Sequence, residues 1–156
     1  MGTSCFFIGH RETGTDIFPD LADAVEQHIN ECGVIDFFVG HYGEFDRLAA
    51  HAVKEAKKLH PEIRLTLVLP YHPAIRPVET PTGFDGTYYP WEDEEIPKRV
   101  AIIKTNQRMV DTCDYLITYA FHFHGGTGQI VEYARKRESK GVIQITNLAQ
   151  NKPSHL

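Results

Sequence analysis

Five short apolar runs alternate along the chain with longer amphipathic stretches. The runs are rich in β-branched and aromatic residues and cover 4–9, 34–40, 64–70, 114–120 and 141–147. Most are continuously apolar rather than alternating, a pattern typical of strands that are covered on both faces of a parallel sheet. We therefore predict five buried strands.

The stretches between these runs have helical periodicity. Apolar residues recur there at steps of three and four, in 20–32, 45–56, 100–113 and from 130 onward. Gly33 follows the first stretch at the position where a glycine commonly ends a helix, and Pro61 follows the second. Each predicted strand is thus separated from the next by a helix. Between the third and fourth strands, the long segment 71–97 precedes that helix.

The strict alternation of strands and helices predicts an α/β fold with right-handed crossovers. We expect a single Rossmann-like domain over 1–150, with a mainly parallel five-stranded sheet flanked by helices, and a C-terminal tail over 151–156. The segment 71–97 breaks the rhythm, since it holds five of the nine prolines and no clear period. A loop of this length is usually functional. Its aromatic residues either stack on a ligand or pin the loop to the domain, and both interpretations stay open.

Composition and charge limit the classes of partner that the chain is expected to bind. No apolar run reaches the length of about 18 residues that a membrane-spanning helix needs, and the first residues do not have the pattern of a secretory signal, so we predict a cytoplasmic protein. The three cysteines lie far apart, which argues against a disulfide framework. The formal net charge is −5, and because nucleic-acid backbones normally require a basic face, DNA is predicted to be an unlikely partner.

Histidine and glycine gather where the predicted strands end. Five of the nine histidines follow four different strands, namely His10, His41, His72, His122 and His124. The carboxyl ends of parallel strands meet at one edge of the sheet, where α/β folds bind their ligands. A metal site built on His122 and His124, with His10, His41 or His72 as a further ligand, is one interpretation. Since the chain has no HExxH motif and no pair of neighbouring cysteines, we assign no metal.

A glycine cluster in the stretch 124–129 opens the last helix. We predict that it binds phosphate through its backbone N–H groups, with the members His124, Gly125, Gly126, Thr127, Gly128 and Gln129. Glu132 lies four residues beyond Gly128 and leans back toward the same end of the helix. Either it faces the ligand, or it is a solvated side chain that pairs with Lys136.

Two further strand ends add candidate ligand contacts. After the second strand, Gly40, Gly43 and Asp46 form a turn that leads into a helix, and Asp46 either accepts hydrogen bonds from ribose hydroxyls or caps that helix. After the first strand, Gly9, His10 and Arg11 lie at the predicted edge. Arg11 suits bidentate binding of a phosphate, and a surface ion pair is the alternative.

Four motifs, in the order in which they occur, resemble those of the SLOG superfamily. They are "GHRETG", "GHYGEFDRLAAHAV", "TNQRMVDTCDYLI" and "HGGTGQIVEYA", and the resemblance covers residues 3 to 147. This superfamily contains Rossmann-like domains related to DNA-processing protein A and to the LOG phosphoribohydrolases. Within it, the chain looks most like the YpsA-like, DUF1273-type branch of small bacterial and phage-associated proteins.

The resemblance has functional implications. The LOG pattern Pro-Gly-Gly-x-Gly-Thr-x-x-Glu matches Gly125, Gly126, Gly128 and Glu132 in register, whereas His124 and Gln129 replace its proline and threonine. Thr105 stands where those enzymes have an arginine, with Arg108 nearby. The resemblance therefore implies a nucleotide or nucleotide-derived ligand of the NAD, ADP-ribose or nucleoside monophosphate class, bound by a sensor, regulator or sequestering protein.

The alternative is an N-glycosidase of the phosphoribohydrolase type, with Glu132 and tentatively Arg108 as catalytic residues. No cofactor beyond the nucleotide-type ligand is expected. The resemblance also implies a homodimer.

Overall fold

A single parallel sheet of six strands organises the chain. The computed structural model describes residues 3–10, 12–41, 43–92, 94–121 and 125–151. The strands are β1 (Thr3–Gly9), β2 (Val34–Val39), β3 (Arg64–Val68), β4 (Gly86–Tyr88), β5 (Tyr115–Tyr119) and β6 (Gln144–Asn147). Their order across the sheet is β4-β3-β2-β1-β5-β6, and every neighbouring pair is parallel. The predicted α/β class with a parallel sheet is confirmed.

The sheet has one strand more than the five predicted. The additional strand, β4, lies inside the segment 71–97 and pairs with β3 from Thr66–Gly86 to Val68–Tyr88. It has only three residues and forms an edge of the sheet, where its side chains are largely exposed. Such a strand needs no apolar run, so hydrophobic patterning alone does not reveal it.

Four helices cover the two faces of the sheet. They are α1 (Phe18–Cys32), α2 (Glu44–Leu59), α3 (Lys98–Thr112) and α4 (Gly125–Ser139), and two short 3₁₀ helices, η1 (Thr15–Ile17) and η2 (Leu148–Asn151), accompany them. Gly33 ends α1 with a φ of 70°, a left-handed conformation that glycine adopts without steric cost. The helix boundary predicted from that glycine is therefore confirmed.

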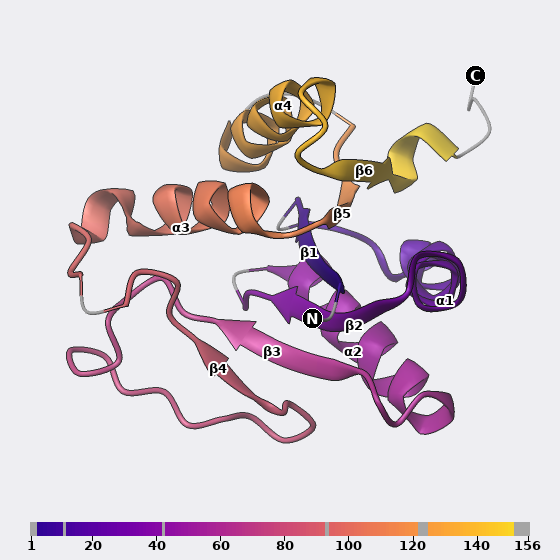
Figure 1. Cartoon of the computed structure of the whole chain (residues 1–156), viewed down its shortest axis with the longest axis horizontal. Coiled ribbons are helices and arrows are strands. Elements are labelled where there is room, and N and C mark those ends of the chain that lie inside the picture. Colours follow the sequence, from indigo (N-terminus) through magenta and orange to yellow (C-terminus); the bar gives the residue numbers. More distant parts are fainter. Residues whose placement is uncertain (1–2, 11, 42, 93, 122–124, 152–156) are drawn as a thin grey trace.

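The core consists of two layers, one on each side of the sheet. Side chains of a strand alternate between the faces. On β1, Cys5 and Phe7 pack toward α1 and α2, whereas Phe6 and Ile8 pack toward α3 and α4. Figure 1 shows α1 and α2 on one side of the sheet and α3 and α4 on the other. Each fully buried phenylalanine stabilises the fold by roughly 1.5–3 kcal/mol relative to an exposed one.

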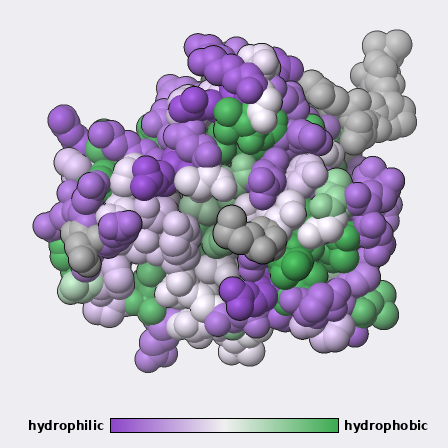
Figure 2. Space-filling model, viewed as in Figure 1, coloured by the Kyte–Doolittle hydropathy of each residue, from purple (hydrophilic) through white to green (hydrophobic). Residues whose placement is uncertain are grey.

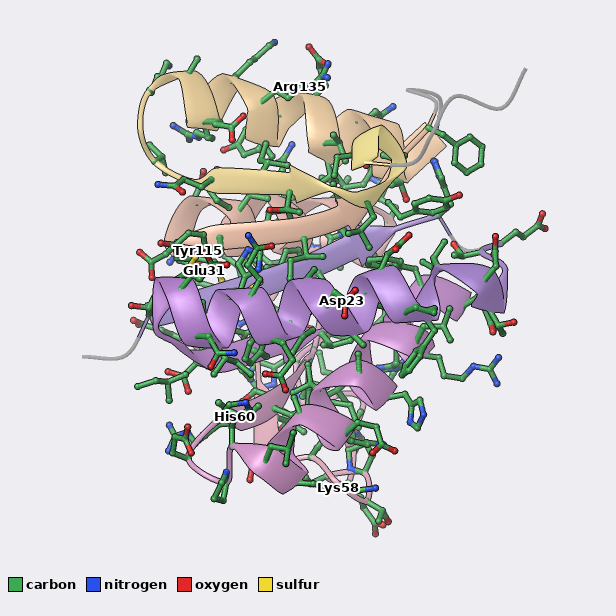
Figure 3. All side chains as sticks on the ribbon, turned by 90° about the vertical axis from the view of Figure 1, so that its right-hand side faces the viewer. Asp23, Glu31, Lys58, His60, Tyr115 and Arg135 are labelled. Atoms are coloured by element: carbon green, nitrogen blue, oxygen red, sulfur yellow. The ribbon has the colours of Figure 1, made fainter. Side chains whose placement is uncertain are left out.

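The outer faces of the helices are polar. Asp23 projects from the outside of α1, and Lys58 projects from the far end of α2 (Figure 3). Hydrophilic residues dominate the face shown in Figure 2, where apolar residues form separate patches. Of the helices that the structure describes, none combines the length and the apolar character required to cross a membrane.

Candidate functional site

A cavity of about 490 Å³, here called the central cavity, lies at the carboxyl ends of the inner strands. Residues that follow β1, β2 and β3 line it, together with the first turn of α4 and one face of α3. The chain runs outward from β1 to β4 and then returns to β5 on the other side of β1. Open α/β sheets bind ligands beside such a reversal of strand order, which is where the central cavity lies.

The glycine turn predicted to bind phosphate forms one end of the central cavity. Gly125, Gly126 and Thr127 line it from the first turn of α4. Gly125 has a φ of +72°, and a Cβ atom added to Gly126 would meet no heavy atom within 4 Å. The first N–H groups of a helix have no acceptor within the helix, and they carry its positive partial charge. This end of the cavity is therefore suited to an anion.

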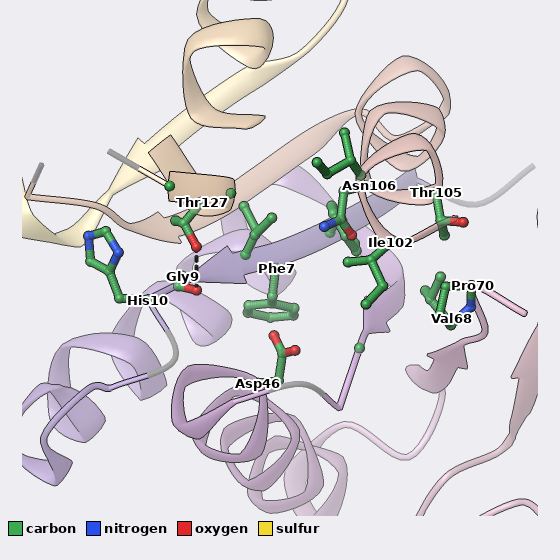
Figure 4. Close-up of a pocket in the computed structure, with 16 residues that line it drawn as sticks. Phe7, Gly9, His10, Asp46, Val68, Pro70, Ile102, Thr105, Asn106 and Thr127 are labelled. Carbon is green, nitrogen blue, oxygen red and sulfur yellow. Dashed lines mark hydrogen bonds between the residues drawn. The ribbon is translucent and has the colours of Figure 1, made fainter. Parts of the chain in front are cut away.

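Gly9 and Thr127 connect β1 to this helix. The Thr127 hydroxyl donates a hydrogen bond of 3.0 Å to the backbone oxygen of Gly9, as Figure 4 shows. A Cβ atom on Gly9 would lie 2.3 Å from Cγ of Phe45, which is buried in α2. Only glycine allows β1, α2 and α4 to approach so closely. Gly9 therefore has a packing role as well as its place in the cavity lining.

His10 lines the same end of the cavity and is only 8% exposed. Its Nε2 accepts a hydrogen bond of 3.2 Å from the backbone N–H of Phe121. The Phe121 ring also meets the imidazole edge-on, with the ring centroids 4.5 Å apart. An accepting Nε2 carries no proton, so the neutral tautomer has its proton on Nδ1.

Asp46 and Gly40 line the middle of the central cavity. Asp46 comes from the first turn of α2, and Gly40 directly follows β2. In Figure 4, Asp46 lies between Thr127 and Gly9 on one side and Ile102, Val68 and Pro70 on the other. A carboxylate only accepts hydrogen bonds, so Asp46 is suited to the hydroxyl groups of a bound ligand.

The opposite end of the cavity is mainly apolar. Val68 and Pro70 extend from β3, and Ile102 faces them from α3. Asn106 lies one helical turn beyond Ile102 and adds an amide group. None of these residues was among the site residues predicted from the sequence. The spacing of Ile102 and Asn106, four residues apart on one helix face, is the signal that marks them as neighbours.

Thr105 joins the central cavity to the long segment 71–97. Its side chain is buried and lines the cavity, and its hydroxyl oxygen accepts a hydrogen bond of 3.0 Å from the indole nitrogen of Trp91. The guanidinium carbon of Arg108 lies 5.1 Å from the centroid of the Trp91 ring. Phe84, from the same segment, packs against the core. At these two aromatic residues the structure favours the pinning interpretation of the segment.

The two residues predicted to be catalytic do not line the central cavity. Glu132 is exposed and, together with Gly128 and Gln129, borders a separate cavity of about 530 Å³ that is lined by α4 and by Gln107 of α3. Its carboxylate lies 3.9 Å from the guanidinium of Arg135, not beside Lys136. Arg108 stacks on Trp91 as described. The structure therefore brings neither residue to the cavity that Asp46 lines.

The remaining predicted residues fall into two groups. Gly43 borders a neighbouring cavity of about 790 Å³, here called the side cavity, which also has Gly40 and Asp46 in its lining. Arg11, His122 and His124 lie outside the residues that the structure describes. Within the described ranges, no group of three or more His, Cys, Asp or Glu residues is arranged to hold a metal ion.

The arrangement of strands and helices defines the class of fold. It is a Rossmann-like α/β fold, as the sequence resemblance implied. No protein-family model and no curated protein sequence matches the chain. The finer assignment to the DUF1273-type branch stays a prediction.

Two solved structures of DNA processing protein A share this fold. The protein from Streptococcus pneumoniae is 14% identical, with a TM-score of 0.56 over 96% of this chain. The protein from Helicobacter pylori is 13% identical, with a TM-score of 0.61 over 99% of this chain. The chain spans 60% and 66% of the lengths of these two proteins. At such identities the likeness concerns the fold.

The prediction that DNA is an unlikely partner conflicts with these neighbours and was wrong. The H. pylori protein is described by its unique mode of binding single-stranded DNA. A fold of this type therefore serves a DNA-binding protein, and the net charge of −5 does not exclude that class of partner. Binding depends on the charge at the contact surface, which an overall sum does not describe.

Proposed function

We propose that the chain binds a nucleotide or nucleotide-derived ligand in the central cavity, as a sensor, regulator or sequestering protein. The observation that carries the proposal is the order of chemical groups along this cavity. The helix start at Gly125 and Gly126 suits a phosphate, Asp46 suits ribose hydroxyls, and the wall of Val68, Pro70 and Ile102 suits a base.

The phosphate end has physical support beyond the glycine pattern. The space above Gly126 is open, so a ligand oxygen can approach the backbone closely. A negative charge at a helix start gains about 0.3–1 kcal/mol from the helix dipole when exposed, and up to about 2 kcal/mol when partly buried. Hydrogen bonds from free N–H groups to a charged oxygen add to this gain.

Binding is a better match to the geometry than cleavage. N-glycosidic hydrolysis builds positive charge on the sugar, which a fixed carboxylate must stabilise. Glu132, the predicted catalytic acid, is exposed beside Arg135 and does not line the central cavity. Among the described residues that line this cavity, Asp46 is the acidic one. We therefore favour a binding protein over the phosphoribohydrolase alternative.

Isothermal titration with AMP and ADP-ribose tests the proposal. In Gly126→Asp, the added carboxylate meets the phosphate end, so we expect affinity to fall at least about tenfold. Gln129→Glu is the matched control, because it adds the same charge one turn later on α4, outside the central lining. This control is expected to bind as the unchanged protein does.

Two results would contradict nucleotide binding in the central cavity. One is the absence of heat of binding for every nucleotide in a panel of purine and pyrimidine mononucleotides and ADP-ribose. The other is an equal loss of affinity in Gly126→Asp and Gln129→Glu, which would indicate a site elsewhere on α4. Circular dichroism of each variant separates a loss of binding from a loss of fold.

Single-stranded DNA is a second candidate ligand, because the H. pylori protein of the same fold binds single-stranded DNA. In this case one nucleotide unit of the strand occupies the central cavity. Fluorescence anisotropy with a labelled oligothymidylate measures the binding, and Gly126→Asp is expected to weaken it. Competition by AMP distinguishes a strand held in the central cavity from one bound to another surface.

A further inference from the structure

The side cavity has a lining unlike that of the central cavity. It lies between the first half of α2, the turn that follows β2, and the stretch 78–84 of the long segment. Leu67, Val78 and Phe84 form an apolar wall, and Lys54 enters from α2. The cavity of about 790 Å³ is large enough for an aromatic ring with a substituent.

Lys54 is a cation without a carboxylate partner among the residues that the structure describes. Its ammonium nitrogen lies 5.2 Å from the centroid of the Phe84 ring. The next residue, Asp85, offers a carboxylate, but that group is bound by Lys57 at 2.6 Å. The stem of Lys54 passes close to Gly83, where a Cβ atom would lie 2.8 Å from Cε of the lysine. The stem of Lys54 thus runs along Gly83, and its ammonium group lies beside the aromatic wall.

The other charges around the side cavity are largely balanced. Arg47 forms an ion pair with Glu44 in the first turn of α2. The imidazole of His51 lies 4.0 Å from the carboxylate of Glu55. Asp46 lies at the border with the central cavity, whose lining it shares. Among the described residues of this lining, Lys54 is thus the cation best placed to bind an anionic ligand.

We propose that the side cavity binds an aromatic ring that carries an anionic group, with Lys54 as the cation. The ring packs against Phe84 and the apolar wall, and the anion meets the ammonium group. A neutral apolar ligand would remove water from Lys54 without supplying a partner, which is costly. A small inorganic anion would leave the apolar wall exposed to water. An aromatic anion satisfies both parts of the lining.

Titration of the full chain with 1-naphthyl phosphate tests this site. Lys54→Ala is expected to weaken binding at least tenfold, and Lys54→Arg to restore most of it. Lys58→Ala is the matched control, because Lys58 lies one turn further along α2 and projects into solvent beside Glu55 (Figure 3). The control should bind as the unchanged protein does. Neutral 1-naphthol and inorganic phosphate are each expected to bind at least tenfold more weakly.

A parallel titration with 1-naphthoate identifies the preferred anion, and binding of either compound through Lys54 supports the proposal. The proposal is overturned if neither compound binds, or if Lys54→Ala and Lys54→Arg bind as tightly as the unchanged protein. It is also overturned if Gly126→Asp abolishes binding, since the ligand then occupies the central cavity. Because the probe contains no nucleotide, a failure of AMP to bind leaves this test unaffected.

Discussion

Gly9 illustrates how one residue serves both packing and the site. It ends β1, its carbonyl oxygen receives the Thr127 hydroxyl from α4, and its missing side chain leaves room for Phe45 of α2. Gly9 was predicted to contact a ligand because of its position at the end of a strand. The close approach of Phe45 depends on the packing of α2, which residue patterns near Gly9 do not reveal.

We predict that Gly9→Ala destabilises the fold. The added methyl group would lie within 3 Å of three ring carbons of Phe45, and overpacking of this kind typically costs about 1–3 kcal/mol. Denaturant unfolding measures the loss. Gly126→Ala is the control, since a Cβ atom there meets nothing within 4 Å. Equal stabilities of the two variants would contradict the proposed contact.

The buried His28 is expected to make the stability of the fold depend on pH. It is buried in α1, where its Nδ1–H donates a hydrogen bond of 2.7 Å to the Ala24 carbonyl. Desolvation lowers its pKa below the usual 6.5, although the bond to Ala24 and the charge of Glu31 oppose the shift. Because the unfolded chain binds this proton more readily, stability is highest above pH 6.5 and falls as the pH drops below it.

The variant His28→Gln removes this titration. We expect its unfolding free energy to decrease less than that of the unchanged protein between about pH 7 and pH 5. A residual slope is expected, because desolvation also lowers the pKa of His41. Chemical unfolding at several pH values measures the difference. Identical slopes for the two proteins would show that His28 titrates alike in the folded and unfolded states.

Asp46 and Glu132 show what could be predicted of the site and what could not. Both carboxylates follow glycine turns at helix starts, so sequence patterns treat them alike. In the structure Asp46 lines the central cavity, whereas Glu132 borders a different cavity and lies beside Arg135. The difference arises from the rotation of each helix about its axis. That rotation is set by packing of Phe45 in α2 and of Ile130 and Val131 in α4 against the core.

Among the secondary-structure elements, continuous apolar runs made the inner strands predictable. The runs at 4–9 and 34–40 correspond to β1 (Thr3–Gly9) and β2 (Val34–Val39). The short edge strand β4 was not predictable, because its backbone pairs with β3 while its side chains remain exposed. Periodicity therefore identifies elements that bury side chains. It misses an element held mainly by backbone hydrogen bonds.

The hydrogen bond between Trp91 and Thr105, which attaches segment 71–97 to α3, can be tested by mutation. Thr105→Val removes the acceptor of the Trp91 indole hydrogen bond, at a cost of about 0.5–1.5 kcal/mol. Trp91 is the only tryptophan in the chain. We therefore expect its fluorescence emission to shift to longer wavelength, and proteolysis within 71–97 to become faster.

Thr112→Val is the control for the Trp91 contact. The Thr112 hydroxyl bonds to the carbonyl oxygen of Arg108 within the same helix and does not touch Trp91. Emission and proteolysis of this variant should match those of the unchanged protein. If Thr105→Val also left both unchanged, the hydrogen bond to Thr105 would not be what holds this part of the segment.

For the whole molecule, the charge balance bears on how DNA would bind. The chain has 16 Lys and Arg residues against 21 Asp and Glu. A strand held through one or two phosphates gives a logarithmic salt dependence of about −0.7 to −1.4, at about −0.7 per phosphate. We predict a slope in this range for oligothymidylate, measured by anisotropy at several salt concentrations. A slope steeper than about −3 would instead require an extended basic track.

The homodimer implied by the sequence resemblance stays a prediction about the whole molecule. Analytical ultracentrifugation of the 17.7 kDa chain separates a monomer from a dimer directly. Performing the measurement with and without nucleotide shows whether assembly depends on the ligand. A single species of monomer mass at high protein concentration would contradict the dimer.

The two cavities share Gly40 and Asp46, which makes them thermodynamically dependent on each other. A ligand that binds the Asp46 carboxylate in one cavity changes the electrostatic field and the available volume in the other cavity. The resulting change in affinity must be the same factor in both directions, because coupling free energies are reciprocal. If both occupants are anions, their repulsion makes this coupling negative, and each ligand then reports on the concentration of the other.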